Sequence, residues 1–273
     1  MLWHDEEGTI PIIGRTKQHL YILPHVLLRH IIAHYTVLLP FESDEKLLLR
    51  PDASGCMILT KSEEGMAQAG FWGPTTQVVE VQGQKVHHGF QFFVEFLPGG
   101  AYALLGIDQK QVVDLQIELS EVTKQLSSAL TRDLEQVKYL SEWIRSVDHL
   151  FINELMETDA KEQFNRSAWF ISNHIAKVSV SKLSQEMCYS SRQLSRICNE
   201  TIGMSIKTYQ QIVRINQAIK MMKRSQMDLT QIAQYLGYYD QAHFIHDFKA
   251  ITHMSPTAYF KSMSVFYNEP YKL

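Results

Sequence analysis

The sequence has few cysteines and no long apolar run. Of its 273 residues only three are cysteine, Cys56, Cys188 and Cys198, and they lie far apart. Secreted domains that depend on disulfides carry a denser and paired set. The three cysteines therefore indicate free thiols in a reducing compartment. No stretch approaches the run of about 18 apolar residues that a membrane span needs.

Several sequence signatures of enzymes are also missing. The chain has no glycine-rich phosphate loop with a lysine, no His-Glu-x-x-His and no Gly-x-Ser-x-Gly. Its first ten residues carry acidic side chains where a signal peptide carries basic ones before an apolar core. We therefore expect a cytoplasmic protein without membrane contact, which is not an enzyme and uses no cofactor.

The net charge of −3 conceals an uneven distribution along the chain. Residues 1–164 carry 13 Lys and Arg against 23 Asp and Glu, a net charge of −10. Residues 165–273 carry 13 against 6, a net charge of +7. A basic half joined to an acidic half indicates that any polyanion binds to one domain only.

The first part of the chain has the pattern of short β-strands. Apolar runs rich in Val, Ile and Phe are separated by clusters of Gly, Pro, Asp and Ser, which is typical of a small barrel or sandwich. These runs lie at residues 30–39, 45–50, 55–60, 76–82 and 89–96. From Asp114 to Leu155 apolar residues recur every three or four positions, which predicts a helical hairpin or one long broken helix. We expect a sensing domain at 1–112 and a helical connector or dimerisation segment at 113–160.

Residues 165–262 repeat one helical plan twice. Each unit has a short helix, a three-residue turn, a polar N-cap and a second helix, and the expected N-caps Ser190 and Asp240 lie 50 positions apart. Gly237 is expected to take the left-handed conformation that ends the first helix of the second unit. This plan is that of a helix-turn-helix. Residues 205–225 predict a linker helix about 30 Å long, close to the ~34 Å repeat of the major groove on one side of B-DNA.

The second helix of each unit has an apolar face and a polar face. Leu194, Ile197 and Cys198 are expected to point inward in the first unit, as are Phe244, Phe248 and Ile251 in the second. The remaining side chains are of types that hydrogen-bond to base edges or phosphates or contact a thymine methyl. The candidate DNA-binding residues are Ser191, Arg192, Ser195, Arg196, Asn199, Gln241, Ala242, His243, His246 and Lys249.

Two other classes of protein fit the sequence less well. A metal enzyme would need His87, His88 and Glu95 around one ion, but adjacent residues of a strand point to opposite faces, so no metal site is expected. Cys56 has the surroundings of a strand cysteine packed in the core. A scaffold that binds proteins through its helix pairs would expose apolar residues where this chain has polar ones.

The second unit resembles the signature of the AraC/XylS family of bacterial transcription regulators. The match lies in LTQIAQYLGYYDQAHFIHDFKAITHMSPTAY, residues 229–259. The shared positions are Ile232, Ala233, Gly237, Asp240, Gln241, Phe248, Lys249, Ser255, Pro256 and Tyr259. The first unit is similar at Leu194, Arg196, Gly203 and Tyr209. The resemblance covers residues 165–262 and implies a monomeric reader whose two helices enter successive major grooves of promoter DNA.

Four positions depart from that signature. Tyr238 replaces the usual Phe, a change that we expect to be harmless. Cys198 stands where Phe is common, so the first unit is expected to pack less tightly. His246 occupies a position often taken by Arg, which weakens any transfer of sequence specificity from the family. His253 stands where Gly is common.

The front half is similar to the divergent N-terminal domain of certain regulators in this family. In those regulators Pro-Asp-Gly and Pro-Gly-Gly-Ala punctuate a small barrel of cupin-like character, whereas here Ala53 follows Pro51 and Asp52. The expected fold class is α+β, with a small cupin-like β-barrel domain, a helical connector and an all-α domain of two helix-turn-helix units.

The resemblance implies a sequence-specific transcription regulator that is gated by its N-terminal domain, and on family grounds an activator. The implied partners are double-stranded promoter DNA and RNA polymerase. A small-molecule effector and a homodimer are left open. The alternative is an effector-independent regulator, or a dimerising scaffold whose N-terminal domain binds a protein partner.

Overall fold

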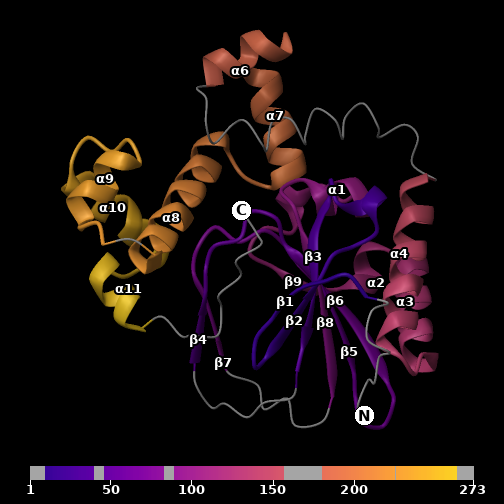
Figure 1. Cartoon of the computed structure of the whole chain (residues 1–273). Coiled ribbons are helices and arrows are strands. Elements are labelled where there is room, and N and C mark those ends of the chain that lie inside the picture. The colour runs from indigo at the N-terminus through magenta and orange to yellow at the C-terminus, as the bar shows by residue number, and fades with distance from the viewer. Residues whose placement is uncertain (1–9, 40–45, 83–88, 157–179, 225, 263–273) are drawn as a thin grey trace.

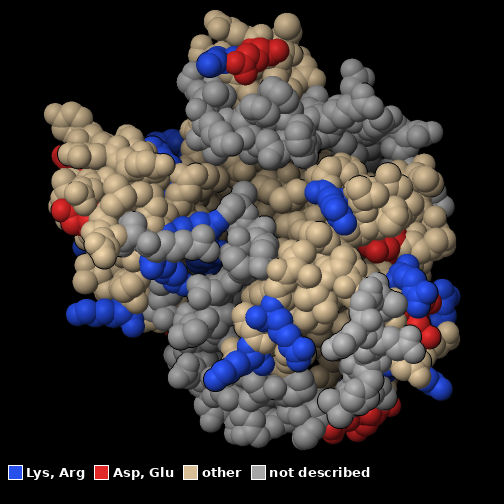
Figure 2. All heavy atoms as spheres, in the orientation of Figure 1, with Lys and Arg blue, Asp and Glu red and all other residues tan. Residues whose placement is uncertain are grey.

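The computed structural model describes residues 10–39, 46–82, 89–156, 180–224 and 226–262. A β-rich N-terminal half is followed by a helical C-terminal half, which confirms the predicted fold class (Figure 1). Figure 2 shows the same view with charged side chains coloured. No helix in the described ranges is both long enough and apolar enough to cross a membrane.

The N-terminal half is built on a seven-stranded antiparallel sheet in the order β1-β2-β3-β8-β5-β6-β9. Strands β4 and β7 pair separately with each other. Among the described strands the large sheet does not close into a barrel, although it is compatible with a cupin-like domain. The strand bounds are Ile12–Arg15 (β1), His19–Ile22 (β2), Ile32–Leu38 (β3), Lys46–Leu49 (β4), Cys56–Lys61 (β5), Ala67–Trp72 (β6), Val79–Gln82 (β7), Phe90–Phe96 (β8) and Gln116–Glu118 (β9).

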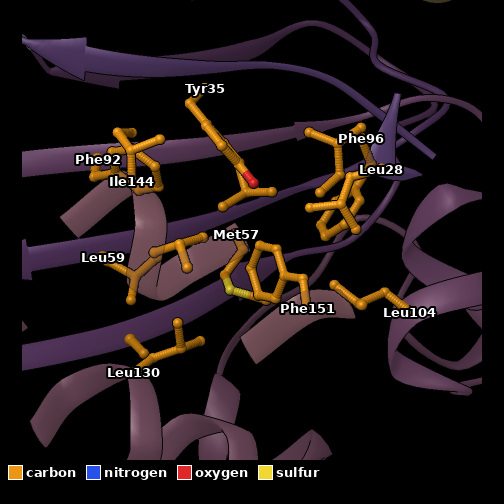
Figure 3. Close-up of a cluster of buried hydrophobic side chains, with 14 of the residues drawn as sticks. Leu28, Tyr35, Met57, Leu59, Phe92, Phe96, Leu104, Leu130, Ile144 and Phe151 are labelled. Atoms are coloured by element: carbon orange, nitrogen blue, oxygen red, sulfur yellow. The ribbon is translucent and has the colours of Figure 1, made fainter. Parts of the chain in front are cut away.

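A helical hairpin covers one face of this sheet, as one of the two sequence alternatives predicted. Helix α3 (Lys124–Gln136) and helix α4 (Leu140–Met156) lie side by side against the strands (Figure 1). Sheet residues such as Tyr35, Leu59 and Phe92 face Leu130 of α3 and Phe151 of α4 in one buried cluster (Figure 3). The other short elements of this half are η1 (Val26–Leu28), α1 (Gly100–Leu105), η2 (Gln109–Gln111) and α2 (Leu119–Val122).

The C-terminal half contains the two predicted helix pairs. The first pair is α6 (Val180–Met187) and α7 (Ser191–Ile202), and the second is α9 (Leu229–Tyr235) and α10 (Gln241–Thr252). Helix α8 (Ile206–Arg224) joins the pairs, and α11 (Pro256–Ser262) follows the second. Residues 165–179, the predicted start of this domain, lie outside the described residues.

The core of the C-terminal half includes a residue of the N-terminal half. Ala53 is fully buried among the apolar side chains of the helical half. Beside it, Asn216 Nδ2 of α8 donates a buried hydrogen bond to the Pro51 carbonyl oxygen, at 2.9 Å. The Val78 amide donates to the Ile251 carbonyl oxygen of α10, at 3.2 Å. The two halves therefore share packing as well as polar contacts.

A buried lysine ties β5 to the end of α3. Lys61 Nζ lies 2.8 Å from the carbonyl oxygens of both Leu134 and Glu135. The last carbonyls of a helix have no partner within the helix and need one from elsewhere. Lys61 supplies it, so the side chain links the hairpin to the sheet that it covers.

Lys61→Met keeps the length of this side chain and removes its hydrogen bonds. Because buried carbonyls would then lack a partner, we expect the free energy of unfolding of the N-terminal half to fall by about 1–3 kcal/mol. Urea denaturation followed by circular dichroism measures the change. Lys124→Met, at the exposed start of α3, is the control and should change the midpoint little. Equal midpoints for the two variants would contradict this role for Lys61.

Candidate nucleic-acid interface

The second helix of each pair begins at the predicted N-cap. Ser190 Oγ accepts a hydrogen bond from the Gln193 amide, at 3.2 Å, and Gln193 Oε1 accepts one from the Ser190 amide. Asp240 Oδ1 accepts from the His243 amide, at 2.7 Å. Gly237 has φ +77° and ends α9, as predicted. These local bonds determine where α7 and α10 start and therefore which side chains lie on their outer faces.

The inward-facing residues are also where the sequence places them. Leu194, Ile197 and Cys198 of α7 are buried, and so are Phe244, Phe248 and Ile251 of α10. Burial raises the pKa of the Cys198 thiol to about 12. A thiol with that pKa is protonated and unreactive at neutral pH. Cys198 therefore serves as a small core residue.

The predicted residues of α7 form a single row on the helix. Positions i, i+1, i+4, i+5 and i+8 share one face, and Ser191, Arg192, Ser195, Arg196 and Asn199 have that spacing. The first four are exposed and Asn199 is half-buried. The Asn199 side-chain amide donates to the Ser195 carbonyl oxygen, at 2.8 Å. The row is thus a continuous polar strip with arginine at two of its five positions.

Arg196 is held by an acid on its own helix. Arg196 Nη1 lies 3.1 Å from Glu200 Oε1 and 3.3 Å from Oε2. The C-terminal part of α7 contacts α1 of the N-terminal half. Burial, and after it the charge of Glu200, raises the pKa of Tyr102 in α1. Glu200 was not among the predicted site residues. Its spacing of four from an arginine was the available signal.

The predicted residues of α10 separate into two groups. Gln241, Ala242, His246 and Lys249 have the same spacing as the row on α7, at a constant offset of 50 positions. His243 lies away from that row, and its ring packs edge-on against Tyr238 with 5.2 Å between ring centroids. Four of the five candidates therefore lie together on α10, and the fifth, His243, contacts Tyr238 in the turn between α9 and α10.

Sequence analysis missed Ile245 and two tyrosines beside this row. Ile245 occupies the remaining place in the row and is half-buried. Tyr235 and Tyr239 flank the start of α10 and are 74% and 92% exposed. Large aromatic side chains are rarely so exposed to solvent. The hydroxyl group of each of these two tyrosines can hydrogen-bond to a phosphate. Tyr235 ends α9 and Tyr239 lies in the turn before α10, and these positions between the two helices were the available signal.

Two contacts organise the base of α10. Gln241 Oε1 accepts a hydrogen bond from Thr230 Oγ1 of α9, at 3.0 Å, which orients its amide group. The Arg214 guanidinium lies over the Tyr238 ring, 4.9 Å from its centroid. Burial raises the pKa of Tyr238 to about 12, while Arg214 opposes that rise. Tyr238 is thus a neutral, buried residue.

On the face shown in Figure 2, the Lys and Arg side chains of the described residues lie over both halves, with acidic side chains among them. The rows of side chains on α7 and α10 are a more specific feature than this distribution of charge.

The N-terminal half contains a buried polar group on its sheet. Glu95 of β8 is 2% exposed, and β3 places His34 opposite it. Burial lowers the pKa of His19 to about 4, although the charge of Glu95 opposes this shift. No cluster of three metal-binding side chains occurs in the described residues. His87 and His88, the other ligands considered, lie outside them.

Comparison with known proteins defines the helical half. Residues 183–262 match the family model described as a helix-turn-helix domain. Over 110 residues the chain is 26% identical to the arabinose operon regulatory protein of Escherichia coli, an alignment that covers 40% of this chain and 38% of that protein. The C-terminal half therefore contains a helix-turn-helix domain, and this part of the chain is similar to the arabinose operon regulatory protein.

Two other comparisons align with more of the chain. The probable transcriptional regulator LumQ of Photobacterium leiognathi is 27% identical over 161 residues, which cover 56% of this chain and 65% of that protein. A structure of ToxT from Vibrio cholerae aligns with 84% of this chain and 98% of its own, at 12% identity and a TM-score of 0.40. The chain spans about two fifths of the length of the arabinose regulatory proteins that it matches.

Glu200→Gln should strengthen binding to DNA. The change removes the negative charge that holds Arg196 and leaves the guanidinium free for a phosphate or a guanine. We expect a gain of about two- to fivefold, because an exposed ion pair contributes up to about 1 kcal/mol. Fluorescence anisotropy with duplex DNA measures it, and Glu186→Gln on α6 serves as control. Equal or weaker binding by the Glu200 variant would show that Arg196 does not reach DNA.

His246→Arg should tighten binding and flatten its pH dependence. The charge of a histidine side chain depends on pH near neutrality, whereas arginine stays charged throughout and offers more donors to a phosphate or a guanine. Affinities measured at pH 6, 7 and 8 compare the two proteins. Identical affinities and identical pH profiles would exclude His246 from the interface.

Proposed function

We propose that the chain is a sequence-specific transcription regulator that inserts α7 and α10 into adjacent major grooves of promoter DNA. The observation that carries this proposal is the duplicated row of side chains. Five positions of α7 and four of the five positions 50 residues later in α10 carry side chains that are exposed or half-exposed to solvent. The fifth position of α10, Ile245, packs against the core of the helical half. Both rows belong to a domain that matches helix-turn-helix proteins.

The linker helix supports the two-groove arrangement. Helix α8 has 19 residues, which corresponds to about 28 Å at 1.5 Å per residue. Successive major grooves on one side of B-DNA are about 34 Å apart. A rigid spacer of this length, with a helix pair at each end, can present one reading helix to each groove of a single site.

The side chains indicate how the two grooves would be read. Arg192 and Arg196 suit guanine, which offers two acceptors to a guanidinium. Gln241 suits adenine and Ala242 suits a thymine methyl, whereas Lys249 and His246 suit phosphates as well as bases. The two units therefore read different half-sites, and the whole site is asymmetric.

The remaining parts of the proposal concern the N-terminal half and the partners. Its contacts with α7, α8 and α10 support a gating role for this half, with or without a small effector. Activation of RNA polymerase is proposed from the family alone. A homodimer would place two chains on a pair of sites and raise the avidity without new contacts to DNA.

The test is a selection of bound fragments from random duplex DNA by the full chain, repeated over a salt series. We expect a bipartite site with half-sites one helical turn apart, and an affinity that falls steeply with salt because phosphate contacts release counterions. The full chain is required because Ala53 is part of the helical core. Failure to enrich any sequence at any salt concentration would refute the proposal.

Arg192→Ala should weaken binding to the selected site by about 1–3 kcal/mol and relax the base preference at one position. Arg132→Ala is the matched control, because Arg132 is an exposed arginine of α3 that pairs with Asp133. The same selection with each variant reports affinity and base preference together. Loss of affinity without relaxed preference would assign Arg192 to a phosphate instead of a base.

A further inference from the structure

The two reading helices end at equivalent positions in the same unusual conformation. Gly203 follows α7 with φ +84°, and His253, 50 positions later, follows α10 with φ +58°. This left-handed region is easily reached by glycine and is unfavourable for residues with a side chain. The first unit uses glycine here, whereas the second unit uses histidine. A histidine at such a position calls for a compensating contact.

The C-terminal end of α7 packs closely against the N-terminal half. A Cβ atom at Gly203 would lie 2.6 Å from Val113 Cγ2 and 2.9 Å from the Gln109 carbonyl oxygen. Both distances are too short for real contacts, so only glycine allows this approach. Glycine is therefore required at 203 by its backbone conformation and by its neighbour.

The end of α10 is also attached to the N-terminal half, but through a side chain. His253 Nε2 lies 2.8 Å from Gln77 Oε1, a hydrogen-bonding distance. One residue further along, the Val78 amide donates to the Ile251 carbonyl oxygen, at 3.2 Å. The histidine thus compensates for its backbone conformation with a bond that glycine could not make. Between the two ends, Asn216 fixes α8 to Pro51.

We propose that the N-terminal half sets the relative placement of the two reading helices by holding the C-terminal end of each, and that His253 is a positioning residue in this arrangement. The inference rests on the proposed function, because placement matters only if both helices read one DNA. The N-terminal half contacts α8 and the ends of α7 and α10. These three contacts hold α7 and α10 at a fixed distance and angle to each other. The chain should then discriminate sharply between half-site spacings.

The first test measures, without DNA, the contact that Gln77 and Val78 make with the C-terminal end of α10. Hydrogen exchange of the Val78 amide reports how often this contact opens. Gln77→Ala and His253→Asn each remove the side-chain bond, and asparagine tolerates the left-handed backbone. We expect exchange to become about fivefold faster in either variant, the order of magnitude for one neutral hydrogen bond, with no further increase in the double variant.

The matched control is His149→Asn. His149 is an exposed histidine of α4 whose ring contacts the Asn153 side-chain amide, at 3.3 Å, far from this contact in the fold. It should leave the exchange of Val78 unchanged. Unchanged exchange in Gln77→Ala would overturn the inference, because the bond would then not hold the two halves together.

The second test uses DNA and separates the inference from the proposed function. Affinity is compared for the selected site and for the same site with one base pair inserted between its half-sites. The insertion moves them apart by about 3.4 Å, and it should weaken wild-type binding more than binding by Gln77→Ala. Equal losses would overturn the inference while leaving the proposed function intact. If the wild type selects no DNA, the proposed function fails. The exchange of the Val78 amide still decides whether the bond between Gln77 and His253 holds the two halves together.

Discussion

The hydrogen bond between Asn216 and the Pro51 carbonyl oxygen is the constraint on which the arrangement of the two halves depends. Asn216 lies in the middle of α8, and both helix pairs are attached to the ends of that helix. The bond is buried, so breaking it leaves at least one polar group without a partner, which is costly in free energy. Ala53 fills the adjacent space in the helical core. The position of α8 on the N-terminal half therefore determines where both reading helices lie.

Along each second helix, the side chains proposed to contact DNA lie at different positions from the residues that contact the N-terminal half. The exposed side chains of the rows on α7 and α10, among them Arg192 and Lys249, face solvent. Gly203 and His253 lie at the helix ends that contact the N-terminal half. A change at the N-terminal contacts can therefore alter the placement of a row without altering its side chains. This separation is compatible with the proposed gating role, because the N-terminal half would then not have to cover the rows of α7 and α10.

The sequence predicted the features that depend on near neighbours. The caps at Ser190 and Asp240, the left-handed Gly237 and the buried faces of α7 and α10 follow from spacing within one helix and its turn, and the structure confirms them. The strong strands β3, β5 and β8 were also predicted from their apolar runs. His243 stays a predicted DNA-binding residue; it is exposed, and its ring contacts Tyr238 instead of extending the row.

Other features arise from contacts between distant parts of the chain. Strands β1, β2, β6 and β9 were not predicted. β2 and β6 pair with the predicted strands β3 and β5, and β1 and β9 pair with β2 and β6 in turn. The Lys61 contact with the end of α3 joins residues more than 70 positions apart, and the bond from His253 to Gln77 spans 176. No local pattern identifies such partners. The unusual histidine was visible in the sequence, but its reason became clear only in the fold.

The most direct measurement of the central claim is hydroxyl-radical footprinting of the full chain on its selected site. Insertion of α7 and α10 into adjacent grooves predicts two protected patches on one side of the duplex, centred about 10–10.5 base pairs apart. A single patch, or two patches on opposite sides of the duplex, would contradict the account, because the two helices would then not read successive grooves together.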